Sequence, residues 1–156
     1  MLTAEIKELF SGAEKEQLVV ITVGNPFRSD DGVGAYLASH SHPNRKNLIL
    51  MDAGENLAEL IDQVMLSKPQ KIIIIDAANF GGKIGEIKII PEELIPQSTI
   101  STHSFPLNFV TRIMAKDTGA KVFFLGIQGH NFALGEKLSP PVKKTADQLI
   151  EFLFQI

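Results

Sequence analysis

Residues 71–90, KIIIIDAANFGGKIGEIKII, contain two strand-like segments joined by a short connection. The first, 71–75, is a continuous apolar run, which is typical of a strand buried on both faces of a parallel sheet. The second, 86–90, alternates between apolar and polar residues and indicates a half-buried strand. A parallel crossover needs about a dozen residues or more, and residues 77–85 are too few for one. The second segment is therefore predicted to run antiparallel to the first.

Three further strands are predicted around this segment. Two apolar runs, 17–23 and 121–127, resemble 71–75 in composition, and residues 47–52 predict another strand. Helical patterns of apolar residues lie between the strands, at 31–42, 56–66, 106–116 and 140–154. Strands that alternate with helices at this spacing indicate a doubly wound α/β domain. Its sheet is predicted to be mixed and five-stranded, mostly parallel, with one antiparallel strand at about 86–90.

The composition narrows the class of protein. A chain of 156 residues with 44% hydrophobic residues is expected to form a single domain over residues 1–156. Its net charge of −3 gives no basic surface for nucleic acid, and its apolar runs are shorter than the roughly 20 residues of a membrane helix. The absence of cysteine excludes disulfides, thiolate metal sites and a catalytic thiol. An acidic N-terminal segment without the apolar centre of a signal peptide indicates a cytoplasmic protein.

The glycine-rich segment 24–34, GNPFRSDDGVG, follows the predicted strand 17–23. It does not match a dinucleotide fingerprint, because Leu37 stands where the third glycine is required, and adjacent carboxylates would repel a pyrophosphate. Capping of the next helix by Ser29 or Asp30 accounts for one aspartate. The second aspartate, Asp31, is predicted to lie at the carboxyl end of the strand, where α/β sheets bind ligands.

Two more side chains are expected at the same edge of the sheet. Asp76 closes the apolar run KIIIID, and His103 lies just before the predicted helix 106–116. Each has an ordinary structural interpretation, as a carboxylate bonded to turn amides or as a histidine at a helix start. Together with Asp31, however, they offer two carboxylates and one imidazole, a ligand set suited to a divalent first-row metal with open coordination positions.

Other polar residues are weaker candidates. His40 and His42 could chelate as a His-x-His pair, but the interpretation favoured is that they are solvated at a helix end. His130 follows the last long strand and could reach the same cleft. Asp52 and Glu55 end another predicted strand, where turn capping accounts for them.

Four segments together resemble the family of NiFe-hydrogenase maturation endopeptidases, which trim a C-terminal extension from the precursor of the hydrogenase large subunit. They are VVITVGNPFRSDDGVG, KIIIIDAANFGGKIGEIKII, STHSFPLNF, and VFFLGIQ with the later LSPPV. The resemblance extends nearly from end to end of the chain. It implies a three-layer α/β/α fold with one antiparallel strand, and it places Asp31, Asp76 and His103 at the metal-binding positions.

The resemblance also implies what the site acts on. The partner is the large-subunit precursor, and the metal is nickel supplied by that substrate, for which other divalent metals can substitute. Catalysis is assigned to Asp31 and Asp76, by metal-activated water, by a carboxylate base or by an aspartic-protease dyad. Two rival functions remain open: a metal-dependent chaperone that does not cut, and a nucleotide-binding enzyme. No partner subunit is implied, so a monomer is the default.

Overall fold

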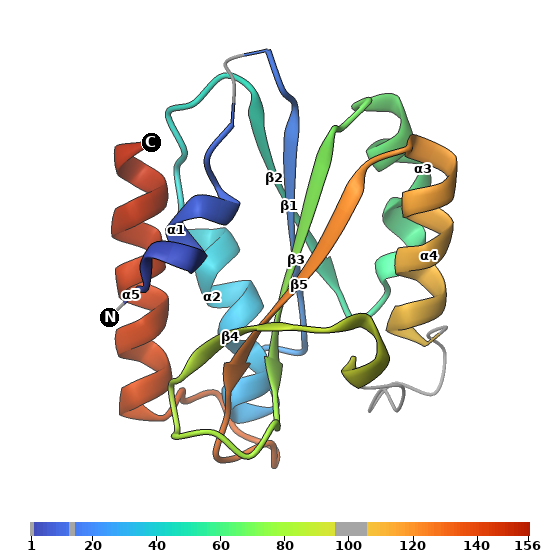
Figure 1. Ribbon diagram of the computed structural model, residues 1–156. Helices are drawn as coiled ribbons and strands as arrows, with labels where there is room; N and C mark the ends of the chain where they lie inside the picture. Colours follow the sequence, from blue (N-terminus) through green and yellow to red (C-terminus); the bar gives the residue numbers. More distant parts are fainter. Residues whose placement is uncertain (1, 13–14, 96–105) are drawn as a thin grey trace.

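Five strands form one mixed sheet in the order β2-β1-β3-β5-β4 (Figure 1). The computed structural model describes residues 2–12, 15–95 and 106–156. The strands are β1 (Leu18–Val23), β2 (Leu48–Gly54), β3 (Lys71–Ala78), β4 (Ile87–Ile90) and β5 (Lys121–Gln128). Strand β1 pairs in parallel with β2 and β3, and β3 pairs in parallel with β5. Strand β4 runs antiparallel to β5, which confirms the prediction from the short connection after β3.

The three longest apolar runs form the centre of the sheet. Residues 19–21 of β1 and 72–75 of β3 are completely buried. A central strand with a helix layer on each face has no solvated side, so its side chains are apolar at every position rather than at every second one. This is why the continuous runs of the sequence become parallel strands, whereas the alternating segment becomes the edge strand β4.

Helices cover both faces of the sheet, which confirms the three-layer arrangement (Figure 1). One face packs against α1 (Ala4–Leu9), α2 (Val33–His40) and α5 (Pro140–Gln155), and the other against α3 (Ile61–Leu66) and α4 (Leu107–Thr118). Three short 3-10 helices complete the described chain: η1 (Ser29–Gly32), η2 (Leu57–Leu60) and η3 (Glu92–Leu94). No helix in the part of the chain that the structure describes is long and apolar enough to cross a membrane.

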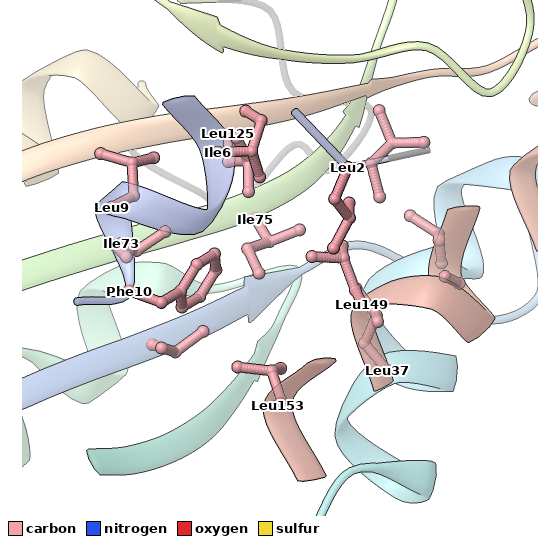
Figure 2. Close-up of a cluster of buried hydrophobic side chains, with 14 of the residues drawn as sticks. Leu2, Ile6, Leu9, Phe10, Leu37, Ile73, Ile75, Leu125, Leu149 and Leu153 are labelled. Carbon is pink, nitrogen blue, oxygen red and sulfur yellow. The ribbon is translucent and has the colours of Figure 1, made fainter. Parts of the chain in front are cut away.

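Helix α1 is an element that the sequence patterns did not predict. It has only six residues, and Thr3 caps it by accepting a hydrogen bond from the Ile6 backbone N–H at 3.2 Å. Figure 2 shows Leu2, Ile6, Leu9 and Phe10 grouped with side chains of the sheet and of α5. The helix is therefore stabilised by its buried side chains, since a segment this short has little helical stability of its own.

Parallel pairing determines where the loops meet. Strands β1, β3 and β5 end at the same edge of the sheet, the lower edge in Figure 1. The segments 24–28, 79–86 and 129–139 follow these three strands. This edge therefore collects the loop that carries Asp31, the end of the strand that carries Asp76, and the long connection before α5.

Candidate functional site

The loop after β1 is compact because two of its glycines permit very close backbone contacts. Gly24 adopts φ +138°, and a Cβ atom there would lie 2.0 Å from the Asp31 carbonyl oxygen. A Cβ atom at Gly34 would lie 2.6 Å from the carbonyl oxygen of Val23. These glycines therefore press the start of α2 against the end of β1, and they serve close packing rather than a phosphate cradle.

Asp31 lies in η1, directly beyond the end of β1. Its Oδ2 accepts a hydrogen bond from the Asn25 backbone N–H at 2.9 Å, and the residue is partly buried. Burial raises the pKa of the Asp31 carboxyl, and the negative charge of Glu55 raises it further. The Asn25 N–H and the positive charge of Arg28 act in the opposite direction, but the pKa remains above its ordinary value.

Asp76 lies within β3, opposite Gly126 of β5, with 8% of its surface exposed. Its Oδ1 is buried and has no hydrogen-bond partner among residues 2–12, 15–95 and 106–156. Burial raises the pKa of the Asp76 carboxyl well above its usual range, and the charge of Asp31 raises it further; the Ala77 N–H opposes this only in part. A buried carboxylate oxygen without a donor is unusual, since nearly all buried polar atoms are hydrogen-bonded.

Asp31 and Asp76 are thus brought close enough for the charge of Asp31 to raise the pKa of Asp76. Two neighbouring carboxylates can share a proton or bind a cation, and carboxylate oxygens are good ligands for divalent metals. No described group of three His, Asp or Glu side chains is arranged to hold a metal ion. The third predicted ligand, His103, lies outside the described residues, so its placement in the site stays a prediction.

Asp30 has a different role from the helix cap that the sequence suggested. Helix α2 begins after Gly32, and no side chain caps it. The Asp30 carboxylate is completely buried and accepts four hydrogen bonds, from the backbone N–H groups of His130, Asn131 and Ser139 and from the Ser139 hydroxyl, at 2.6–3.0 Å. Burial alone would raise the pKa of Asp30, but these bonds outweigh it and lower the pKa. Asp30 therefore ties η1 to the segment 129–139.

Ser29 is likewise a link between loops and not a cap. It adopts φ +54°, a conformation that a residue with a side chain rarely adopts. Its N–H donates to the Gly135 carbonyl oxygen at 2.7 Å, and its hydroxyl donates to that of Ala133 at 2.8 Å. The Gly135 N–H donates in turn to the Phe27 carbonyl oxygen at 2.9 Å. We call residues 25–31 and 129–139, joined in this way, the paired loops.

The weaker candidates have structural roles in the part of the chain described. Asp52 accepts hydrogen bonds at 3.1 Å from the Thr22 hydroxyl and from the Gly54 N–H, as expected for a residue that caps a turn. His40 Nδ1 lies 2.8 Å from the Tyr36 carbonyl oxygen at the exposed end of α2. His130 is exposed, and its backbone rather than its imidazole contacts Asp30.

Gln128, at the end of β5, is a positioning residue that the sequence patterns did not single out. Its buried Oε1 accepts hydrogen bonds from the backbone N–H groups of Phe80 and Gly82, at 2.9 and 3.2 Å. Its Nε2 donates to the Gly129 carbonyl oxygen at 2.8 Å. Gln128 therefore holds the loop that follows Asp76. The one signal for it was a polar residue directly after the apolar run VFFLGI.

Comparison with known proteins identifies the family of this chain. Residues 33–156 match the sequence model of the hydrogenase maturation protease family, a match that begins two residues after Asp31. The Hydrogenase 3 maturation protease of Escherichia coli is 31% identical over 137 residues, which cover 86% of this chain and 87% of that protein.

Solved structures agree with this match. The crystal structure of the NiFe hydrogenase maturation protease HycI from Thermococcus kodakarensis superposes with a TM-score of 0.81 at 27% identity, over 96% of both chains. The solution structure of the endopeptidase HycI from Escherichia coli superposes with a TM-score of 0.73 at 28% identity, over 86% of this chain and 87% of that one.

Proposed function

Because the chain belongs to the hydrogenase maturation protease family, we propose that it removes the C-terminal extension from the precursor of a NiFe-hydrogenase large subunit. In this proposal, cleavage follows nickel insertion, and the bound nickel is part of what the protease recognises. The observation that carries the proposal is the buried Oδ1 of Asp76, which has no hydrogen-bond partner in the described part of the chain and lies beside the charge of Asp31. An arrangement that is unfavourable in the free protein is expected where a cationic substrate group completes the site.

The substrate's nickel is proposed to bind to Asp31, Asp76 and His103. The first two side chains fit this role, because burial and then the charge of Asp31 raise the pKa of Asp76, and a divalent cation would supply the positive charge that this carboxylate lacks. His103 is assigned from the motif STHSFPLNF alone. Other divalent metals are expected to substitute for nickel at oxygen and nitrogen ligands.

The same carboxylates are proposed to move the protons of peptide hydrolysis. Asp76 is the better proton acceptor of the pair, because its pKa is raised well above the ordinary value. It would take a proton from water as the water oxygen bonds to the scissile carbonyl carbon, whose π electron pair moves to the carbonyl oxygen. When the C–N bond breaks, the departing nitrogen takes up the proton, which leaves a new carboxyl terminus and a free amine.

Dependence on nickel follows from the same charges. A precursor without the metal would approach the site and leave the Asp31 and Asp76 carboxylates without a counter-charge. Part of the binding free energy is then available only to the loaded precursor, which makes cleavage conditional on metal insertion.

Paired cleavage assays test the proposal. Nickel-loaded and nickel-free precursor are incubated with the protein, and the products are weighed by mass spectrometry. We expect a C-terminal fragment from the loaded form alone, and no fragment when His103→Ala replaces the wild-type protein. Asp52→Asn is the matched control, since Asp52 is an aspartate of the same edge with its own hydrogen-bond partners. Binding of the loaded precursor without any fragment would instead identify a chaperone.

A further inference from the structure

Two large apolar side chains are exposed at the edge of the sheet where the carboxylates lie. Phe27, in the loop after β1, has 60% of its surface exposed, and Leu134, in the loop after β5, has 80% exposed. Single exposed apolar residues are ordinary on protein surfaces. These two, however, lie on the paired loops, whose backbones are joined at Phe27 and Gly135, so they are neighbours although they are far apart in the sequence.

The backbone that presents these side chains is held firmly. The Gly135 N–H donates to the Phe27 carbonyl oxygen, and Ser29 donates from both its N–H and its hydroxyl to the loop that carries Leu134. The buried carboxylate of Asp30 fastens the same loop through four further hydrogen bonds. A strained φ of +54° at Ser29 persists only where its surroundings fix it, and such strain is concentrated at functional sites.

One residue connects this apolar pair to the carboxylate pair. The Asn25 backbone N–H donates to the Asp31 carboxylate at 2.9 Å, and the Asn25 side-chain oxygen accepts from the Phe27 N–H at 2.8 Å. Phe27 and Asp31 thus belong to one hydrogen-bonded turn. The exposed Phe27 therefore lies in the same turn as a residue that is proposed to receive the substrate's metal.

We propose that Phe27 and Leu134 form an apolar docking platform for the precursor, contacting apolar side chains that flank its cleavage site. This inference rests on the proposed protease function and names the surface that receives the substrate. The occupant is a polypeptide because the proposed substrate is one, and its cleavage site has to reach Asp31, which Asn25 connects to Phe27. At protein interfaces a few well-buried side chains carry most of the binding free energy.

The test compares two double variants that are matched in the exposure of the substituted side chains. The double variant Phe27→Ser with Leu134→Ser removes the platform. The double variant Phe154→Ser with Leu66→Ser is the control, because those side chains are equally exposed, at 56% and 82%, but lie on α5 and α3. With loaded precursor we expect the platform variant to raise KM by about tenfold or more, with kcat within about twofold of the wild type. The control variant should match the wild type in both constants.

Several outcomes would overturn the inference. One is an unchanged KM in the platform variant, and another is an equal rise in the KM of the control variant. The third is concentration-dependent self-association of the wild type that the platform variant abolishes, since a second copy would then be the occupant. Titration calorimetry of the precursor against Asp76→Asn protein, with and without the platform substitutions, measures docking without cleavage. Platform-dependent binding there would support the inference even if the wild type failed to cleave, so the two proposals can fail separately.

Discussion

Asp30 and Asp76 are both buried aspartates near the carboxyl edge of the same sheet, yet their surroundings are opposite. Asp30 accepts four hydrogen bonds, and its pKa lies below the ordinary value. Asp76 has a buried oxygen without a partner in the described chain and faces the charge of Asp31, and its pKa lies well above the ordinary value. The two residues therefore contrast a structural use of one side-chain type, at Asp30, with the functional use that we propose for Asp76.

The contrast shows which of the two ionised aspartates stabilises the native state. The bonds to Asp30 stabilise its charge, so the native state benefits from the ionised carboxylate. The native state gains no such benefit from Asp76, because burial and a like charge disfavour the ionised form. A residue of the second kind persists in a protein when it is needed for something other than folding, and the substrate cation or proton transfer that we propose would supply that need.

The largest expected effect is on catalysis by the variant Asp76→Asn. We expect its cleavage of loaded precursor to fall by at least about 100-fold, since a positioned acid–base group contributes about 100- to 10,000-fold. Its free energy of unfolding at about pH 7 should not fall, because the substitution removes a carboxyl whose ionised form is disfavoured by burial and by the charge of Asp31. Single-turnover cleavage measures the loss of activity, and urea denaturation of the same preparation measures the free energy of unfolding. A variant that is both inactive and much less stable would contradict the comparison.

The reverse pattern is expected of Asp30→Ala. Loss of the carboxylate leaves four donors of the segment 129–139 without an acceptor, which should lower the free energy of unfolding by about 3 kcal/mol or more. Urea denaturation measures this directly. Asp31→Ala is the matched control, because its carboxylate accepts one backbone bond, from Asn25, and should cost far less. Equal losses in the two variants would mean that the bonds to Asp30 are worth no more than one ordinary bond.

The sequence was sufficient for most of the fold because its information is local. The short connection between β3 and β4 determines that β4 is antiparallel, and the continuous apolar runs identify the central strands. The roles of Asp30 and Asp31 could not be separated in this way. They are adjacent in the chain, and what distinguishes them is contact with residues 130–139, about a hundred positions away. The Asp76 oxygen that lacks a partner among the described residues likewise depends on three-dimensional placement that no spacing encodes.

The smallest expected effect, and the most direct comparison of the two residues, is the pH dependence of stability. Stability rises with pH wherever the unfolded chain binds more protons than the native state. The pKa of Asp30 is lowered, so its contribution is complete above the ordinary value of 3.8 and is lost as the pH falls through the lower native pKa. The pKa of Asp76 is raised, so its native carboxyl holds a proton that the unfolded chain has released, and stability declines as the pH rises from 3.8 through the native pKa.

Urea denaturation between about pH 3 and 7 separates these opposite slopes when each variant is compared with the wild type. The stability of Asp76→Asn relative to the wild type should increase as the pH rises above 3.8, because the variant lacks the group whose ionisation is penalised. The deficit of Asp30→Asn should instead shrink as the pH falls below 3.8, where the wild-type carboxylate begins to lose its own advantage. Taking differences cancels the titration of groups that do not interact with the substituted aspartate, so parallel curves for either variant would show that its aspartate titrates alike in the native and unfolded states.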